Sequence, residues 1–279
     1  MFKNGVVSRS ISWSFAGRLS AIAVLLSSIS AWAAEPLRVQ ADAVPHAEIL
    51  AYVQKIDPGL NLKVIEIPSG LNPNELLAHG DIDANYFQHV PYLLSQEKAL
   101  NVKFVVAAQV HIEPLGVYSS RHKSYAEVPQ NGTVAVPNNE TNLSRALYLL
   151  QNQGLITLKA GFNDPAKNQA TPRDIAANPK NLKILEVESP QIPRSLPDVD
   201  LAVINGNFAL EAGLTPAKDA LGLEKAQGNP YANILVTTEK LQNDPRIKQL
   251  AKDLESPQVA QFINENFKGS VLPVSAAKS

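Results

Sequence analysis

Apolar positions follow strand and helix periods in turn from residue 37 to residue 118. The runs PLRVQA, LKVIEI, KFVVAAQV and LGVYS have the composition and partial alternation of strands. Between them, PHAEILAYVQKI carries apolar residues at helical spacing. A second helix is expected in NPNELLAHG, where Asn72 can cap the start, Pro73 fits the first turn and Gly80 ends the helix. This order predicts an α/β layer.

The same order returns after residue 132. TVAVP, KILEVE and DLAVING have the pattern of strands, NETNLSRALYLLQNQG that of a helix ending at Gly154, and NFALEAG begins another helix. The alternation of strands and helices predicts a second α/β unit and mainly parallel sheets.

Two segments of the chain share one arrangement. HGDIDANYF (79–87) and LPDVDLAVINGNF (196–208) each combine a D-x-D turn, a short strand, and amide and aromatic residues. Because ligands of open α/β sheets bind beyond the carboxyl ends of the strands, the two segments are consistent with one cleft that both face. Chance is the alternative, since D-x-D turns are common.

The first residues have the order of a secretory signal. Lys3, Arg9 and Arg18 precede the apolar run LSAIAVLLSSIS and the small-residue site AWAA. We predict a signal peptide over residues 1–33, cleaved after Ala33 or Ala34. The apolar run is shorter than the roughly 20 residues of a membrane span. Since the chain contains no cysteine, we expect a soluble periplasmic protein with no lipid-anchor cysteine, no disulfide and no thiolate chemistry.

Composition and motifs exclude several classes of protein. A hydrophobic content of 45% and a charged content of 18% are typical of a globular protein, and the net charge of −1 gives no reason to expect nucleic acid. The sequence has no G-x-S-x-G elbow, phosphate loop or G-x-G-x-x-G fingerprint. His111 and Glu113 share a strand face, but two ligands do not define a metal site. We therefore expect no enzyme, no cofactor and no metal.

Polar and aromatic residues suited to a small zwitterion remain. Asn142 and Arg145 share a helix face, and an arginine fork matches a carboxylate bidentately. A solvated arginine on an amphipathic helix is the alternative. Asn205 in VINGN is suited to an ammonium group or to a turn. A further set offers walls for an apolar side chain: Tyr86, Phe87 and His89.

Six motifs in order resemble one known family. They are VPHAEIL, DIDANYFQHVPYL, VHIEPLGVYS, PNNETNLSRALYLL, AVINGNFALEAGL and PYANILV. Together they are similar to the NlpA/MetQ family, the methionine-binding proteins of bacterial ABC importers. The resemblance extends from about Leu37 to Pro273.

The resemblance implies a type II-like periplasmic binding protein of two α/β lobes with a ligand cleft between them. Two crossover strands would join the lobes, at EPLGVYS and YANILVT. Lobe one would then comprise residues 37–115 plus 232–279, and lobe two residues 116–231.

The resemblance also implies roles for individual residues. Arg145 would hold the ligand carboxylate, and Asn142 and Asn205 its polar end. Tyr86, Phe87 and His89 would enclose the thioether. His111 is placed near the cleft together with Glu113, whereas Tyr92 and Asn207 are expected to be structural.

We therefore expect a monomer that delivers methionine to the permease and ATPase of an ABC importer. L-Methionine is the first choice of ligand, and D-methionine, methionine sulfoxide and other amino acids stay open. Two alternatives are the same fold with another ligand or a non-transport role, and an enzyme built on the same cleft.

Overall fold

The computed structural model describes residue 1 and residues 35–67 and 71–274. The signal peptide predicted for residues 1–33 lies, apart from Met1, outside these described residues. The fold below is that of the unit that begins at Glu35. None of the helices within the described ranges has the length and hydrophobicity that a membrane span requires.

Two mixed sheets form the framework. Sheet A has the strand order β13 (Leu272–Pro273), β4 (Phe104–Ile112), β12 (Ala232–Thr238), β3 (Ala84–His89), β1 (Leu37–Ala41) and β2 (Leu62–Ile65). Sheet B has the order β11 (Gly222–Leu223), β5 (Gly116–Tyr118), β10 (Leu201–Ile204), β6 (Thr133–Pro137) and β9 (Lys183–Val187). A small ribbon pairs β7 (Thr157–Leu158) with β8 (Ile175–Ala177).

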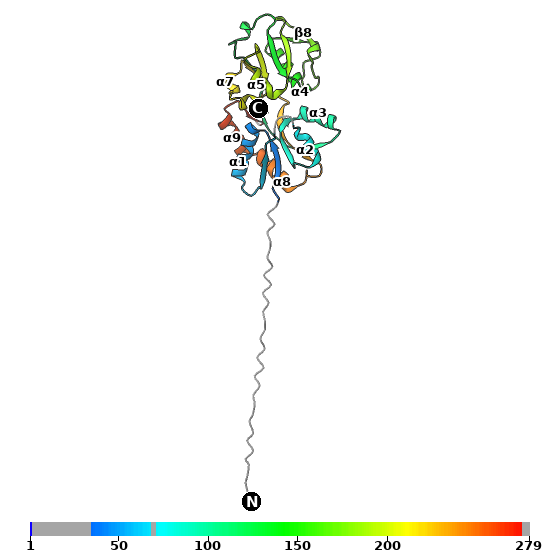
Figure 1. The fold of residues 1–279 in the computed structure, drawn as a ribbon, viewed down its shortest axis with the longest axis vertical. Coiled ribbons are helices and arrows are strands. Elements are labelled where there is room, and N and C mark those ends of the chain that lie inside the picture. Colours follow the sequence, from blue (N-terminus) through cyan, green and yellow to red (C-terminus); the bar gives the residue numbers. More distant parts are fainter. Residues whose placement is uncertain (2–34, 68–70, 275–279) are drawn as a thin grey trace. The chain divides into compact units, whose positions relative to one another are not determined.

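Helices surround the two sheets as two groups, as the labels of Figure 1 show. The helices of the first group are η1 (Ala43–Ala47), α1 (Glu48–Ile56), α2 (Pro73–His79), α3 (Val90–Leu100), α8 (Pro245–Leu254) and α9 (Pro257–Phe267). Those of the second are η2 (Tyr125–Glu127), α4 (Glu140–Asn152), η3 (Pro172–Asp174), η4 (Ser189–Gln191), α5 (Ile192–Ser195), α6 (Gly206–Glu211) and α7 (Pro216–Asp219).

Each sheet is covered by helices on both faces. Strand residues alternate between the two sides, and apolar side chains on each side pack against helices. On sheet A, α1, α8 and α9 bury one face, whereas Leu77 of α2 and Leu93 of α3 pack on the other. On sheet B, Val134 and Val136 of β6 face the core under α4, and Ala135 faces α5 and α6. The protein therefore has two α/β lobes, each with its own core.

The prediction of mainly parallel sheets is wrong. The pairs β1–β2 and β1–β3 are parallel, but β12 lies antiparallel between β3 and β4. In sheet B, β5 is likewise antiparallel to β10 and β11. The physical reason is the connectivity: β12 enters sheet A from the other lobe, and local periodicity carries no information on that direction.

The chain passes between the two sheets twice. The first crossing joins β4 to β5 through residues 113–115, and the second joins β11 to β12 through residues 224–231. The second crossing thus precedes YANILVT, most of which is β12. The predicted lobe boundaries remain a proposal. We keep them, except that the second crossover is placed at residues 224–231.

Local signals account for several helix ends. The side chain of Asn72 accepts a hydrogen bond from the N–H of Asn74, and Gly80 ends α2 with a φ of +79°. These confirm the predicted limits of α2. By contrast, α3 was not predicted, although its start carries signals: the His89 ring accepts from the N–H of Tyr92, and Pro91 lies in the first turn.

Candidate functional site

A cavity of about 530 Å³ lies at the carboxyl ends of strands from both sheets. Its wall includes Asp42 after β1, His89 at the end of β3, Asn138 after β6 and Asn205 after β10. Open α/β sheets bind ligands at this edge, and the volume falls within the roughly 300–1,000 Å³ of small-molecule sites. The cavity is therefore the candidate ligand-binding site.

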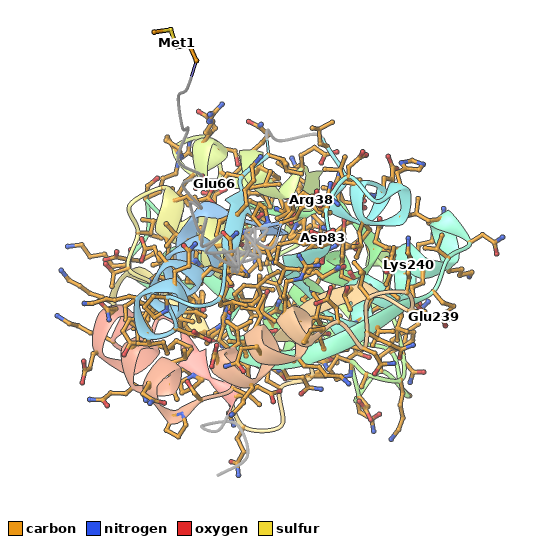
Figure 2. The ribbon with its side chains drawn as sticks, turned by 90° about the horizontal axis from the view of Figure 1, so that it is seen from below. Met1, Arg38, Glu66, Asp83, Glu239 and Lys240 are labelled. Carbon is orange, nitrogen blue, oxygen red and sulfur yellow. The ribbon has the colours of Figure 1, made fainter. Side chains whose placement is uncertain are left out.

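The two segments with D-x-D turns meet at this cavity, but their aspartates do not line it. Phe87 and Asn205 face the same cavity, which confirms that both segments face one cleft. Asp83 instead pairs with Arg38 at 2.7 Å, and the two lie side by side in Figure 2. Asp200 accepts from the N–H of Thr133 at 2.7 Å. These carboxylates connect neighbouring strands at the opposite ends and thus serve the fold.

Five of the seven predicted binding residues line the cavity: Phe87, His89, Asn142, Arg145 and Asn205. The other two, Tyr86 and His111, are fully buried and are absent from the described lining. The Tyr86 hydroxyl donates to Nδ1 of His111, and its ring packs in the core of the first lobe. The prediction that Tyr86 encloses the ligand does not fit this position, because it faces the core from β3.

Arg145 occupies the cavity wall with most of its donors already engaged. Its Nε and Nη2 donate to the Glu224 carboxylate at 2.8 and 2.6 Å, and Nη2 also donates to the carbonyl of Glu113 at 2.9 Å. The guanidinium lies 4.3 Å from the centre of the Tyr231 ring. The bidentate fork predicted for the ligand carboxylate is therefore used by Glu224. Among the described residues, no acceptor contacts Nη1, which is the donor that remains for a ligand.

Asn142 is the centre of the amide cluster in the cavity. It lies in the first turn of α4, where the Asn139 side chain caps the helix by accepting from the N–H of Asn142 at 3.0 Å. The Asn142 Oδ1 accepts from Nδ2 of Asn205 at 3.2 Å and lies 3.1 Å from Nε2 of His89. The Asn205 Oδ1 is buried and has no hydrogen-bond partner among the described residues.

His89 is a neutral donor in this cluster. Its Nδ1 accepts from the N–H of Tyr92, so Nε2 carries the proton that is donated to Asn142. Burial, together with the nearby charge of Arg145, lowers the pKa of His89 to about 3. The ring therefore adds no positive charge to the cavity at neutral pH.

Three cavity-related residues escaped the sequence analysis. Asp42 lines the cavity, and burial, together with Glu113 and Glu211, raises its pKa to about 7. Asn233 lines it from β12, where an amide in the apolar run YANILV was the available signal. For Glu224 the sequence offers no signal, since its partner Arg145 is distant along the chain.

A buried network at the first crossing includes the lining residues Glu113 and Asn233. The ligand atoms of His46, His111 and Glu113 lie within 4.8 Å of one another, a spacing that a metal ion can bridge. Their own hydrogen bonds account for the arrangement. Glu113 Oε1 is 2.7 Å from Nε2 of His111, and Nε2 of His46 is 3.0 Å from Oδ1 of Asn233. Burial acts to raise the pKa of Glu113, but the two histidines outweigh it and hold that pKa below its usual value.

Comparisons with known proteins agree with this fold. A family model described as NlpA lipoprotein matches residues 37–275. The D-methionine-binding lipoprotein MetQ of Escherichia coli (strain K12) is 42% identical over 228 residues, which are 81% of this chain and 82% of that protein.

Solved structures are similar over the same part of the chain. A nutrient binding protein from Burkholderia cenocepacia bound to methionine has a TM-score of 0.80 and 48% identity, over 85% of this chain and 99% of that one. A putative methionine-binding lipoprotein from Bacillus subtilis has a TM-score of 0.81 and 37% identity, over 86% and 98%. These relatives are named as binding proteins rather than enzymes, in agreement with the expectation that the chain is no enzyme.

One expectation is contradicted by the comparisons. Because the chain contains no cysteine, the expectation was a soluble periplasmic protein without a lipid anchor. The matching family and the MetQ relatives are named lipoproteins, which conflicts with that localisation. The cysteine content of a sequence bears only on lipid attachment through a cysteine, and it does not determine where a protein is located. The match over residues 37–275, together with these identities, shows that the chain belongs to the NlpA lipoprotein family.

Proposed function

We propose that this protein is the substrate-binding component of an ABC importer and that its ligand is methionine. L-Methionine is the form that we take as preferred. The names of the Escherichia coli and Burkholderia cenocepacia relatives support methionine as the ligand class.

One observation carries the proposal. The cavity presents an acceptor and a donor with no partner among the described residues: the Oδ1 of Asn205 and the Nη1 of Arg145. An α-amino acid carries the complementary pair, an ammonium donor and a carboxylate acceptor. The Oδ1 of Asn205 is buried, and a buried polar atom without a partner costs about 1–3 kcal/mol, so an ammonium group that satisfies it gains about that energy on binding.

The apolar part of the ligand has its own wall. Phe87, Tyr92 and Phe208 line the cavity, as do Pro73 and Pro190 from opposite lobes. A thioether side chain is flexible and polarisable, and its sulfur makes favourable contacts with aromatic ring edges. We assign Phe87 and Tyr92 to this wall and place Tyr86 and His111 behind it, as supports.

Contacts from both lobes imply that binding and closure are coupled. Asn142, Arg145 and Asn205 belong to the lobe of sheet B, and Phe87 and His89 to that of sheet A. A ligand that touches both lobes favours the closed arrangement by its differential affinity for it. We propose that the closed, loaded monomer is the form presented to the membrane permease and its ATPase.

Isothermal titration of ligand-free protein tests the proposal. Protein that has been unfolded, dialysed and refolded is titrated with L-methionine, D-methionine and L-leucine. We expect saturable binding of L-methionine with a stoichiometry near one, and D-methionine and L-leucine at least about tenfold weaker, a difference of about 1.4 kcal/mol each. Absence of heat with both methionine enantiomers would refute the methionine assignment, whereas tighter binding of D-methionine would reverse the preferred enantiomer.

A further inference from the structure

The charged side chains that line the cavity are predominantly acidic. Five carboxylic acids belong to the lining: Asp42, Glu66, Glu113, Glu188 and Glu211. Within the described part of the lining, Arg145 is the one side chain that is always cationic, because His89 is neutral in its buried position. A cavity built for an amino acid therefore contains a single positive group.

The charge of Arg145 is balanced from outside the cavity. Glu224 is not part of the described lining, yet it holds the guanidinium through two hydrogen bonds of 2.8 and 2.6 Å. Arg145 is buried and Glu224 is largely shielded from solvent, with side-chain exposures of 4% and 11%. In such a setting two opposite charges interact much more strongly than on the surface. The pair therefore contributes little net positive charge to the cavity.

Glu224 is itself held in place at the junction of the two crossings. Its Oε2 accepts from the N–H of Leu115 at 2.9 Å and from Nδ2 of Asn229 at 3.2 Å. Its own N–H donates to the carbonyl of Leu115 at 2.9 Å. A ligand carboxylate cannot replace Glu224 on Arg145 without leaving these donors unpaired in a buried position, which is costly.

Charge therefore separates ligands in a predictable order. A zwitterion finds the open Nη1 group of Arg145 for its carboxylate and an excess of lining carboxylic acids for its ammonium group. An anion without the ammonium group meets the same carboxylates without compensation, and this repulsion excludes it. A cation that lacks the carboxylate meets no repulsion.

We propose that Glu224 is a specificity-determining residue that acts through Arg145: by neutralising the arginine from outside the cavity, it restricts the cleft to ligands of zero or positive net charge. The inference rests on the proposed function, since it takes an α-amino acid as the ligand.

Three ligands of nearly equal shape test the proposal by isothermal titration. They are L-methionine, its α-hydroxy analogue with net charge −1, and L-methioninamide with net charge +1. The readout is the ratio of Kd for the hydroxy analogue to Kd for the amide. In the parent protein we expect a ratio of at least about ten, since tenfold corresponds to about 1.4 kcal/mol. Glu224→Gln adds one net positive charge beside the ligand, so the ratio should fall at least about tenfold.

Two variants separate charge from structural damage. Glu224→Asp keeps the charge and should keep the ratio, even where all affinities fall together. Glu97→Gln is the matched control, because Glu97 is buried and ion-paired to Lys103 at 3.0 Å, and it is not part of the cavity lining. Its ratio should equal that of the parent. A defect in folding would weaken all three ligands equally and leave the ratio unchanged.

Several results would overturn the proposal. The proposal is refuted if the Kd ratio of the parent is below about three, or if the ratio in Glu224→Gln is unchanged. It is also refuted if the ratio falls as much in Glu224→Asp as in Glu224→Gln. A threefold ratio is roughly the uncertainty of two titrations and corresponds to under 1 kcal/mol. Should Glu224→Gln fail to fold, as judged by circular dichroism, the parent ratio decides alone. Failure of L-methionine to bind the parent protein would instead refute the proposed function, so the two failures are distinguishable.

Discussion

The ion pair of Arg145 and Glu224 gives a quantitative prediction about stability. Arg145→Met removes the charge and keeps an unbranched apolar side chain of similar length. The substitution leaves the Glu224 carboxylate, 11% exposed, without its counter-ion. It also removes the hydrogen bond that Nη2 donates to the carbonyl of Glu113.

The magnitude follows from the burial of the pair. Removing one partner of a buried ion pair typically costs about 3–5 kcal/mol, because the remaining charge is uncompensated. For a protein of this size 1 kcal/mol shifts Tm by about 2–4 °C, so we expect Arg145→Met to melt about 6–20 °C lower than the parent. The double variant Arg145→Met/Glu224→Gln carries no charge at the position of this pair, and its amide oxygen can still accept from the N–H of Leu115. It should recover at least about half of the lost free energy.

Urea unfolding of ligand-free protein, followed by circular dichroism, measures these differences. Lys167→Met is the control: Lys167 pairs with Asp164 at 2.9 Å, but it is 78% exposed, and its removal should leave the midpoint unchanged. A loss below about 1 kcal/mol in Arg145→Met would refute the reasoning, because that is the range of exposed pairs. A double variant less stable than the single one would refute it as well.

Further substitutions test the assignment of the cavity wall and the charge of Asp42. Tyr86→Phe should lower the free energy of unfolding by about 1 kcal/mol through loss of its bond to His111 and leave the methionine Kd within threefold; a tenfold weaker Kd would place Tyr86 in the site. Asn205→Ala removes the unpartnered acceptor and should weaken methionine binding at least about tenfold in titration, with an unchanged Kd as the contrary result. Because the pKa of Asp42 is raised to about 7, the folded protein keeps a proton that the unfolded chain releases near pH 4. The free energy of unfolding should therefore fall as pH rises from about 4 to 7, and urea titrations across this range should show a shallower fall in Asp42→Asn; an equal slope in both proteins would contradict the assignment.

Much of the secondary structure was accessible from local patterns. The strands β1, β6 and β10 follow from short apolar runs, and the helices α2 and α4 from capping asparagines and periodic apolar residues. Such signals act within one or two turns of the chain, where the sequence itself places the interacting groups next to each other. The candidate binding residues Asn142, Arg145 and Asn205 were predicted from side-chain chemistry and family resemblance, and all three line the cavity.

The direction of β12 and the orientation of the β3 side chains could be determined only from the tertiary structure. β12 lies antiparallel between β3 and β4 because the chain returns from the other lobe, which no local period encodes. Tyr86 and Phe87 are neighbours in β3, yet one faces the core and the other the cavity. Strand alternation separates the two, but it does not tell which side is which until the sheet is packed.

The sequence by itself determined the two α/β units and the residue types of the candidate zwitterion site. These depend on composition and on contacts between near neighbours in the chain. Only the tertiary structure decided that the fork of Arg145 binds Glu224, 79 residues away, and that Nη1 has no partner among the described residues. Long-range pairing depends on which strands meet and where the chain crosses between lobes, and burial then gives that pairing its strength.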